Sequence, residues 1–490
     1  MWDAIMIWVT PVLTAAAVLA FTALVVAGVV LAVIDRLQTH DAMRRNYPLI
    51  GRFRGLFIGL GEFFRQYFFA MDREEMPFNR AQREWIHRAS DGPGEVTAFG
   101  STRSQTDVGQ AIFTPTAFPA LSEEHEVAPK LVFGPDSPHP YETESFFNIS
   151  AMSYGALSRG AVEALSRGAA QAGCWLNTGE GGLSDHHLAG GADIVFQIGT
   201  AKYGVRDAVG VLDEDRLAAI AAKPQVRMFE IKLAQGAKPG KGGILPAEKV
   251  TEEIARVRGI PVGEASISPN RHRDAGDAAG LIALIEQVRR VTGKPVGIKL
   301  VMGAPEEVDA LLAAFASAGS APDFITVDGG DGGTGAAPMP LMDNVGLTVR
   351  EAIPILADLL AKRGLRGRIR LIASGKLVTP ADVAFALAAG ADAAQSARGF
   401  MFSLGCIQAM KCNMNTCPTG ITTHDPRFQK GLIPVEKAKR VASYHKTMID
   451  EVEMIAHSCG AAHARALSRG HVRVVGRDGT SRSLVELTAA

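Results

Sequence analysis

The sequence predicts an α/β fold, a (β/α)8 TIM barrel preceded by an N-terminal transmembrane helix and a juxtamembrane arm. Three observations support this prediction. Beyond residue 146, eight short β-type runs alternate with alanine-rich helical stretches, glycine-rich segments follow several of these runs, and a long apolar stretch lies near the N-terminus. A doubly wound sheet is the alternative, but the strand count and the positions of the glycine segments favour the barrel.

Length and composition limit the function classes. The chain has 490 residues, enough for one barrel with additional segments. Its 51 basic and 51 acidic residues balance, so no overall field attracts nucleic acid and no nucleic-acid partner is expected. Five cysteines, three of them clustered, argue against a disulfide framework and indicate a reducing compartment.

The N-terminal stretch predicts a membrane anchor. No charged residue occurs from Ala4 to Ile34, which exceeds the roughly 20 apolar residues that span a bilayer. Basic residues such as Arg36, Arg44 and Arg45 follow this stretch, whereas a cleaved signal peptide, the alternative, has a shorter apolar core preceded by basic residues. The basic flank predicts a single-pass protein of the cell (inner) membrane with its catalytic domain on the cytoplasmic side.

The pattern divides the chain into four parts. We expect a transmembrane anchor at residues 1–36, a juxtamembrane helical and irregular arm at 37–145, the barrel at 146–430 with a cysteine loop at 405–420, and a C-terminal helix and small hairpin at 431–490.

Two of these parts carry more detailed expectations. Residues 47–69 are basic and aromatic, so they either lie in the membrane interface or pack as a helix on the enzyme body. At the C-terminal end, a helix is expected over Pro434 to Ala466 and a hairpin over Val472 to Val485.

The barrel elements follow in order along the chain. The expected strands are Phe147 to Ala151, Cys174 to Asn177, Ile194 to Gln197, Met228 to Lys232, Val296 to Val301, Phe324 to Val327, Arg370 to Ala373 and Ala391 to Gln395. The helical stretches between them include Arg159 to Ala172, Ala278 to Val291, Pro305 to Ala318 and Pro380 to Ala389.

Glycine and small polar residues gather where the strands end. They occur at Met152 to Ala156, Asn177 to Gly182, Asp328 to Gly335 and Ser374-Gly375. Glycine allows the backbone to approach a flat or phosphorylated ligand, and TIM barrels often bind phosphate after their seventh and eighth strands. This reasoning assigns a cofactor phosphate to Ser374, Gly375, Gln395, Ala397 and Arg398.

Charged residues within the strands are candidates for chemistry. Lys299 interrupts an apolar run, so it requires an anion, either the N1/C2 oxygen side of a flavin or a salt-bridge partner inside the barrel. Glu230 and Lys232 flank Ile231 and point to the same side of their strand. They either pair with each other or orient a substrate.

Three cysteines predict a metal centre. Cys406, Cys412 and Cys417 are spaced by six and five residues, and Pro418 follows the last. Thiolates select zinc or iron–sulfur, and structural zinc requires four ligands. No nearby Cys or His completes such a set convincingly, because His424 lies beyond the turn made by Pro418 and Gly420. An iron–sulfur cluster with three cysteine ligands is favoured over a zinc site or unrelated thiols.

These motifs together resemble one known family. The segments Ala151 to Ser158, Asn177 to Gly182, Glu230 to Pro239, Asp331 to Ala336 and the cysteine loop resemble the FMN-binding synthase domain of glutamate synthases, in matching order over about residues 145–430. Residues 45–78 also resemble a membrane-linked branch of single-chain glutamate synthase-like proteins.

The resemblance implies a function. It implies FMN and a three-iron four-sulfur (3Fe-4S) cluster, and reductive amination of 2-oxoglutarate with ammonia to glutamate, or its reverse. The electron partner would be a ferredoxin-like or pyridine-nucleotide protein.

The resemblance, with the reasoning above, also assigns residue roles. Catalytic residues would be Lys299, Glu180, Glu230 and Lys232, with Glu180 where ammonia arrives. Substrate would bind Lys238, Arg258 and Gln235, and Cys406, Cys412 and Cys417 would be the cluster ligands. The expected cofactor residues are Met152, Ser153, Tyr154, Gln197, Lys299, Asp331, Gly332, Gly333, Thr334, Ser374, Gly375, Gln395, Ala397 and Arg398.

Departures from the family pattern leave the substrate open. A glutaminase domain is not expected here, so ammonia would come from solution or a partner. Lys241 and Ile244 replace an acidic residue and a substrate-contacting glutamine, and Arg271 and Arg273 add cations to a mouth loop. The alternatives are a related amino-acid oxidoreductase or an N-methylglutamate synthase-like enzyme with another substrate, and a membrane electron-transfer subunit without amino-acid chemistry.

Overall fold

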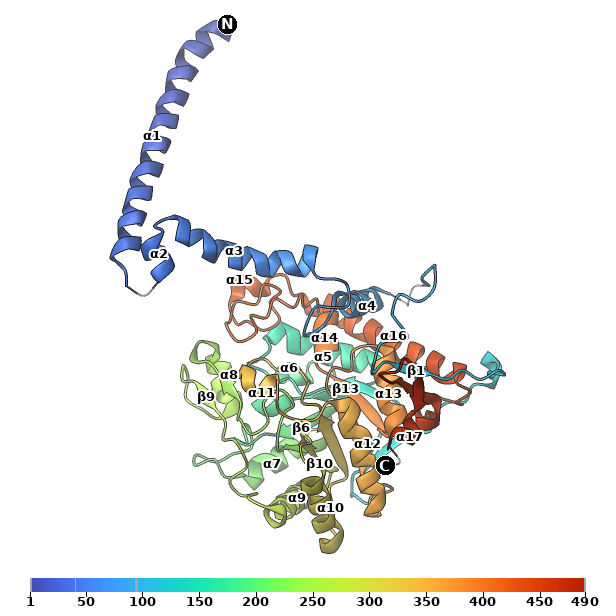
Figure 1. Cartoon of the computed structure of the whole chain (residues 1–490). Helices are drawn as coiled ribbons and strands as arrows, with labels where there is room; N and C mark the ends of the chain where they lie inside the picture. The colour runs from blue at the N-terminus through green and yellow to red at the C-terminus, as the bar shows by residue number, and fades with distance from the viewer. Residues whose placement is uncertain (1, 40, 93–95, 489–490) are drawn as a thin grey trace. The chain divides into compact units, whose positions relative to one another are not determined.

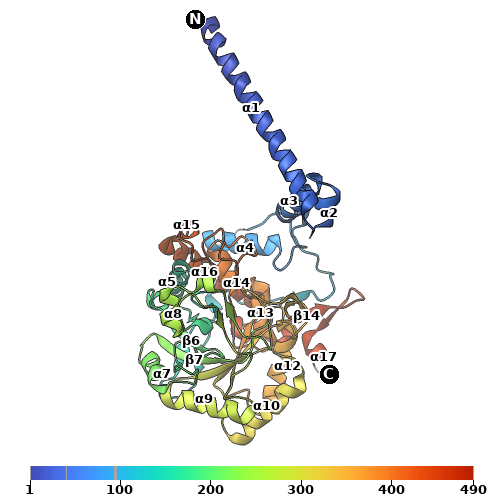
Figure 2. The ribbon, with the colours of Figure 1, turned by 90° about the vertical axis from the view of Figure 1, so that its left-hand side faces the viewer.

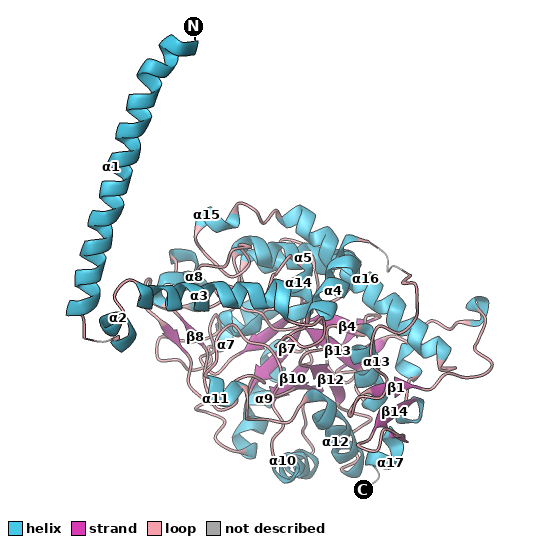
Figure 3. Cartoon of the chain, turned by 45° about the horizontal axis from the view of Figure 1, so that its top comes forward, coloured by secondary structure: helices cyan, strands magenta, loops and turns pink. Residues whose placement is uncertain are grey.

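The barrel prediction is confirmed. The structure is a computed structural model that describes residues 2–39, 41–92 and 96–488. Eight parallel strands close into one barrel (Figures 1 and 3). Ala394 on the last strand pairs with Phe147 on the first. The strands are β4 (Phe147–Ile149), β5 (Leu176–Asn177), β6 (Ile194–Ile198), β7 (Val226–Lys232), β10 (Val296–Leu300), β11 (Phe324–Asp328), β12 (Arg370–Ser374) and β13 (Ala393–Ser396).

Helices form the outer layer around these strands (Figure 2). Local sequence sets their ends: the Ser158 hydroxyl accepts a hydrogen bond from the Ala161 amide at the start of α5, and Gly173 ends that helix with a φ of 68°. The helices that follow the strands are α5 (Arg159–Ala172), α6 (Asp185–Leu188), α7 (Glu214–Ala221), α9 (Ala278–Thr292), α10 (Pro305–Ala318), α12 (Val349–Lys362), α13 (Pro380–Ala389) and α14 (Arg398–Ser403).

An insertion between β7 and β10 was not expected from the sequence. It contains a two-stranded antiparallel hairpin of β8 (Ile244–Leu245) and β9 (Ser266–Ile267), and it includes α8 (Glu252–Arg258). The two strands have only two residues each, too short to produce a recognisable alternating pattern. The insertion matters because it carries the Lys238 loop and Arg258.

Part of the expected arm seals the amino-terminal end of the barrel. Strands β2 (Leu131–Phe133) and β3 (Tyr141–Thr143) pair as a hairpin. Its apolar side chains join residues of the barrel strands in one buried cluster. Phe133 is fully buried and meets Trp175 and Phe324 edge to face, with centroid distances of 5.6 and 5.7 Å.

The C-terminal segment packs on the barrel. Helix α16 (Pro434–Ser458) ends earlier than expected, and β14 (Val472–Val475) and β15 (Ser481–Ser483) form the expected hairpin. Strand β1 (Ala111–Phe113), which the sequence did not reveal, joins this hairpin. The remaining elements are α4 (Arg80–Asp91), η2 (Ser122–Glu124), η3 (Gly179–Gly181), η4 (Ala247–Lys249), α11 (Met339–Met342), α15 (Pro426–Gln429), η5 (Ala464–Ala466), η6 (Arg469–His471) and α17 (Leu484–Thr488).

The first 81 residues form a compact unit separate from Gln82–Ala490. Helix α1 (Trp2–Leu37) contains Trp8–Leu37, which is long and apolar enough to cross a membrane by length and composition. Asp35 near its end pairs with Arg52, with an N–O distance of 2.7 Å. The other helices of this unit are α2 (Ala42–Asn46), α3 (Ile50–Phe64) and the π-helical η1 (Arg65–Phe69).

Two expectations for this part of the chain stay predictions. The four-part division of the chain is one of them. The other is whether residues 47–69 lie in the membrane interface or pack on the enzyme body. The side chains of residues 62 and 63 lie outside the described residues. Residue 1 of the expected anchor also lies outside them.

We expect Phe133→Ala to destabilise the barrel by about 3–5 kcal/mol, because it removes a buried ring and leaves a cavity. Urea-induced unfolding of the full chain in detergent measures this change. Phe118→Ala is the matched control, since that ring is 91% exposed and its loss should change stability by less than about 0.5 kcal/mol. Equal effects of the two substitutions would show that the hairpin does not support the barrel.

Candidate active site

One cavity of about 400 Å³ lies at the carboxyl ends of the barrel strands. It brings together most of the predicted site residues, although they are spread over more than 200 positions of the chain. The predicted residues that line it are Met152, Ser153, Glu180, Gln197, Lys232, Gln235, Lys238, Arg258, Lys299, Gly333, Thr334, Ser374, Gly375, Ala397, Arg398 and Cys412.

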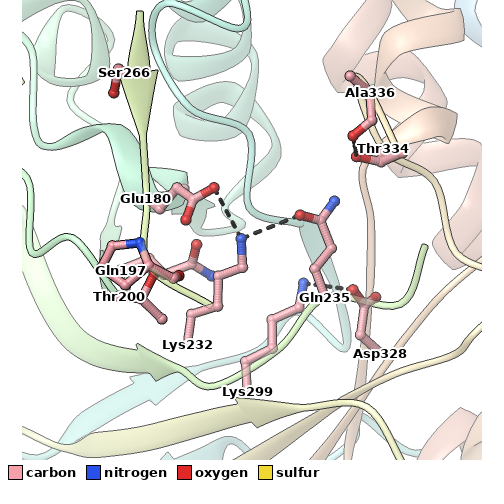
Figure 4. Close-up of polar contacts among 12 residues, drawn as sticks. Glu180, Gln197, Thr200, Lys232, Gln235, Ser266, Lys299, Asp328, Thr334 and Ala336 are labelled. Atoms are coloured by element: carbon pink, nitrogen blue, oxygen red, sulfur yellow. Dashed lines mark hydrogen bonds and ion pairs between the residues drawn. The ribbon is translucent and has the colours of Figure 1, made fainter. Parts of the chain in front are cut away.

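At the centre of the cavity, Lys232 pairs with Glu180 (Figure 4). The Lys232 ammonium lies 3.1 Å from Oε1 of Glu180 and donates to Oε1 of Gln235 at 3.2 Å. The predicted alternative in which Lys232 pairs with Glu230 is therefore wrong. Nε2 of His272 hydrogen-bonds to the Lys232 backbone carbonyl at 3.0 Å and so helps to fix the backbone of this lysine.

Glu180 remains an ionised carboxylate. Burial would raise its pKa, but the ammonium groups of Lys232 and Lys238 outweigh burial and hold the pKa below its usual value. Two glycines leave room for this side chain: a Cβ on Gly243 would lie 2.3 Å from Oε1, and one on Gly199 would lie 2.6 Å from the glutamate Cβ.

A second ion pair joins Lys299 and Asp328, with an N–O distance of 3.2 Å (Figure 4). Both side chains are largely buried and both residues line the cavity. Asp328 also accepts hydrogen bonds from the Gly236 amide at 2.9 Å and the Ser374 hydroxyl at 2.8 Å. Of the two expectations for Lys299, the salt bridge is confirmed. Sequence reasoning missed Asp328, although it begins a glycine-rich segment that was singled out.

Glu230 lies beneath the cavity and is not among the residues that line it. Its carboxylate accepts hydrogen bonds from the side chains of Asn177 at 2.8 Å, Gln197 at 2.7 Å and Thr326 at 2.6 Å. The Glu230 side chain is 1% exposed. Through these hydrogen bonds it joins its own strand, β7, to β5, β6 and β11. Its geometry is that of a residue that holds Gln197 in position under the site.

Two buried cations reach the cavity from the β7–β10 insertion. Lys238 is 8% exposed and Arg258 is 4% exposed. Arg258 donates to the Tyr154 carbonyl at 3.2 Å and to the Ser266 hydroxyl at 3.1 Å, and its guanidinium lies 5.1 Å from the Tyr203 ring centroid. Its Nε is buried without a partner among the described residues. Burial lowers the pKa of Lys238, as does its neighbour Lys232.

The predicted phosphate segments also meet at the cavity. Gly375 has a φ of 119°, which favours glycine, and a Cβ on Gly333 would lie 2.9 Å from Cγ of Arg398. Arg398 donates to the Thr334 carbonyl. Gln395 lies below the cavity, and its buried Nε2 has no partner among the described residues. An unpaired donor of this kind fits a site that holds a polar ligand.

Three other predicted cofactor residues do not line the cavity. The Tyr154 hydroxyl donates to Glu253 at 2.6 Å, and Glu253 in turn contacts His186 at 2.8 Å. The Asp331 side chain accepts from the Val349 amide at the start of α12, and the Gly332 amide donates to the Gly329 carbonyl. These residues shape the surrounding loops.

The cavity carries excess positive charge. Its described lining has two carboxylates, Glu180 and Asp328, against seven cations, which are Lys232, Lys238, Lys249, Arg258, Lys299, Lys376 and Arg398. This balance favours anionic ligands.

Sequence reasoning missed Lys249. It is 2% exposed, lines the cavity, and donates to the backbone carbonyls of Cys412 at 2.7 Å and Thr422 at 2.6 Å. Burial lowers the pKa of Lys249 to about 8, against the opposing effect of Cys412 and Cys417. Lys249 therefore links the cavity to the cysteine loop, a contact between segments 163 residues apart that no local pattern reveals.

The three cysteines lie in one loop after α14. Burial raises the pKa of Cys406, and the neighbouring Cys412 and Cys417 raise it further. Among the described residues, no group of three or more His, Cys, Asp or Glu side chains has the placement that holds a metal ion. Nε2 of His424 bonds to the Gly155 carbonyl at 2.8 Å. This contact holds His424, the histidine that follows the cysteine loop, on the backbone of another segment.

The family described as conserved region in glutamate synthase matches residues 120–462. The chain belongs to the glutamate synthase family. It is therefore a glutamate synthase-like oxidoreductase acting on CH–NH2 donors, and membership supports FMN as its cofactor.

The relatives differ in how much of their own length this chain covers. A Bacillus subtilis protein named glutamate synthase large subunit-like protein YerD is 39% identical over 485 residues, covering 91% of this chain and 92% of that protein. An archaeal-type glutamate synthase (NADPH) of Thermotoga sp. (strain RQ2) is 36% identical over 67% of this chain, which spans 61% of that relative. Among solved structures, an (S)-mandelate dehydrogenase mutant covers 80% of this chain and 90% of its own, at a TM-score of 0.47 and 13% identity.

We expect Arg398→Gln to weaken FMN retention by about 10- to 100-fold, the usual effect of losing a hydrogen bond to a charged group. The measurement is the ratio of FMN to protein after dialysis, followed by titration of the apoprotein with FMN. Arg427→Gln is the control, because the Arg427 side chain is 81% exposed and does not line the cavity. Unchanged FMN affinity in Arg398→Gln would remove this residue from the phosphate site.

Proposed function

We propose that this chain catalyses the reductive amination of 2-oxoglutarate to glutamate, or the reverse oxidation, with FMN and a 3Fe-4S cluster. The observation that carries the proposal is the pair of buried cations, Lys238 and Arg258, that line the same cavity as the ionised Glu180. A dicarboxylate requires two cations, and buried cations bind carboxylates more strongly than exposed ones. Glutamate biosynthesis from ammonia is the direction that the family name favours.

The residues of the cavity have separable roles in this proposal. Condensation of 2-oxoglutarate with ammonia gives 2-iminoglutarate and water, and two electrons and two protons convert the imine to glutamate. Lys238, Arg258 and Gln235 hold the carboxylates. Because Glu180 is anionic, it attracts the ammonium ion, which arrives from solution or from a partner protein and releases a proton to solvent before ammonia condenses. Lys232 fixes the orientation of Glu180 through their ion pair.

FMN would lie along the strand ends. Met152, Ser153, Gln197 and the Gly333–Thr334 backbone would contact it, and Ser374, Gly375, Ala397 and Arg398 would hold its phosphate. Lys299 supplies a positive charge beside it. When bound and reduced, FMN would supply the hydride that reduces the imine. The donor to FMN would be a ferredoxin-like or pyridine-nucleotide protein.

We expect glutamate to bleach the flavin absorbance of the detergent-purified protein under anaerobic conditions. In Lys238→Met, the glutamate concentration for half-maximal bleaching should rise by about 10- to 100-fold, because a charged contact is lost. Lys241→Met is the matched control, since Lys241 is exposed in the same loop and does not line the cavity. The absorbance near the flavin maxima measures both effects.

Two outcomes would contradict the proposal. Protein that contains neither flavin nor iron would rule out the oxidoreductase assignment of this site. A bound flavin that ignores glutamate but is bleached by another amino acid would shift the substrate assignment.

A second candidate is an amino-acid oxidoreductase, or an N-methylglutamate synthase-like enzyme, with another substrate. The observation that favours it is Ile244, an apolar side chain that is 48% exposed and lines the cavity. An apolar residue here accommodates a methyl or alkyl group that a polar side chain would exclude. Flavin bleaching across a panel of amino acids and N-methylglutamate distinguishes the two candidates.

The cluster part of the proposal rests on the cysteine loop. A multi-iron cluster binds each cysteine through a different iron, so its ligands stand farther apart than those of one ion. Gln408, Met410 and Asn415 have φ values of 57°, 51° and 58°, an unusual left-handed conformation for non-glycine residues. A loop with three such residues fits a backbone that wraps a bound group. Cys406, Cys412 and Cys417 would be the ligands.

We expect Cys417→Ser to lower the iron content of the purified protein by more than half, because a cluster with three ligands loses one of them. Iron analysis and electron paramagnetic resonance of the oxidised protein measure the loss. Cys459→Ser is the control, since that cysteine is also buried but lies outside the loop. Wild-type protein with no iron, or equal iron in both variants, would contradict the cluster.

The anchor belongs to the same proposal. Helix α1 would cross the cell membrane once, with the catalytic domain on the cytoplasmic side, as the arginines after the helix favour. The match to the Bacillus subtilis relative over 91% of the chain supports a protein organised in the same way along most of its length.

A further inference from the structure

A second hollow lies at the opposite end of the barrel from the active-site cavity. Its volume is about 800 Å³. Its walls come from the residues that precede β12 and β13, from the C-terminal end of α13 and from the segment of η5 and η6 after α16. Because these residues precede the strands, the hollow faces the amino-terminal ends of the barrel strands. We call it the arginine groove.

Positive charge dominates the described lining of this groove. It contains one carboxylate, Asp392, against five cations, which are Lys130, Arg366, Arg370, Arg465 and Arg469. Two of these cations have acidic partners outside the groove. Arg469 lies 2.8 Å from Asp358, and Lys130 lies 3.8 Å from Glu144.

Of the other three arginines, Arg366 and Arg370 pair with Asp392. Arg366 lies 2.9 Å from this carboxylate and Arg370 lies 3.8 Å from it. Asp392 also accepts the Leu371 amide at 2.7 Å. Three guanidinium groups against one carboxylate leave an excess of two positive charges.

Arg465 is the arginine of the groove with unpaired hydrogen-bonding atoms among the described residues. Its Nε and one terminal nitrogen are buried and have no hydrogen-bond partner among the described residues. Nδ1 of His463, two residues earlier, is buried and unpaired in the same way. Buried donors in folded proteins are almost always satisfied, so a group of unpaired donors in a hollow indicates a ligand. Guanidinium presents paired donors that match the oxygens of a phosphate or carboxylate.

We propose that the arginine groove binds a doubly charged oxyanion, the phosphate group of a small molecule, at a position separate from the active site. An excess of two positive charges matches a phosphate monoester, which carries about two negative charges near neutral pH. The unpaired nitrogens of Arg465 donate to it, and Nδ1 of His463 donates in the tautomer that carries a proton there. This proposal is independent of the amino-acid substrate.

The test uses the full FMN-loaded protein in detergent and phosphate-free buffer at pH 8, with inorganic phosphate as the probe. Calorimetric titration measures binding, and thermal unfolding measures stabilisation. We expect phosphate to bind the unaltered protein, and Arg465→Met to weaken binding by about tenfold or more, because a charged hydrogen-bonding group is lost. Arg477→Met, in the exposed turn between β14 and β15, is the matched control and should bind phosphate like the unaltered protein.

The same variants separate lost binding from lost folding. Without phosphate, Arg465→Met should unfold at the same temperature as the unaltered protein or a higher one, since it removes an unpaired buried charge. Phosphate should then raise the unfolding temperature of the unaltered protein but not that of the variant. Equal phosphate affinity in the two proteins, the same stabilisation by chloride at matched ionic strength, or tighter binding of succinate than of phosphate would each overturn the proposal.

Discussion

Lys232 and Lys299 lie side by side on neighbouring strands, and the organisation of the cavity follows from the need to balance them. The parallel register of β7 and β10 aligns the two residues, so their side chains enter the barrel on the same face. Two adjacent buried ammonium groups are unstable without counter-charges. Each therefore has its own carboxylate, Glu180 for Lys232 and Asp328 for Lys299.

These two carboxylates differ in what else they contact, and the difference assigns the two sides of the cavity. Asp328 is also held by Ser374 and the Gly236 amide, so it belongs to the rim where the phosphate segments meet. Glu180 has glycines around it and faces Lys238 in the β7–β10 insertion. This difference supports the proposal that the first side holds the cofactor and the second side holds the substrate.

The two ends of the barrel are built for different purposes. At the carboxyl end, glycines and cations surround a cavity. At the amino end, the β2–β3 hairpin inserts Phe133 between Trp175 and Phe324 and seals the core. The arginine groove borders this seal, since Leu131 of β2 belongs to the buried cluster and also lines the groove. Strands β12 and β13 run from the groove toward the active-site cavity, which their last residues, Ser374 and Ser396, line.

The sequence by itself determined the barrel, the positions of its eight strands and many of the residues that line the cavity. Strand and helix periodicity is local, and parallel closure brings every strand's carboxyl end to one rim, so a motif that follows a strand must face the site. Only the tertiary structure decided the partners: Lys232 pairs with Glu180 rather than Glu230, Asp328 neutralises Lys299, and Lys249 reaches Cys412. These contacts join segments that are far apart in the chain, and the arginine groove exists for the same reason. Whether two distant charges pair depends on their distance in space, and their separation along the sequence does not give that distance.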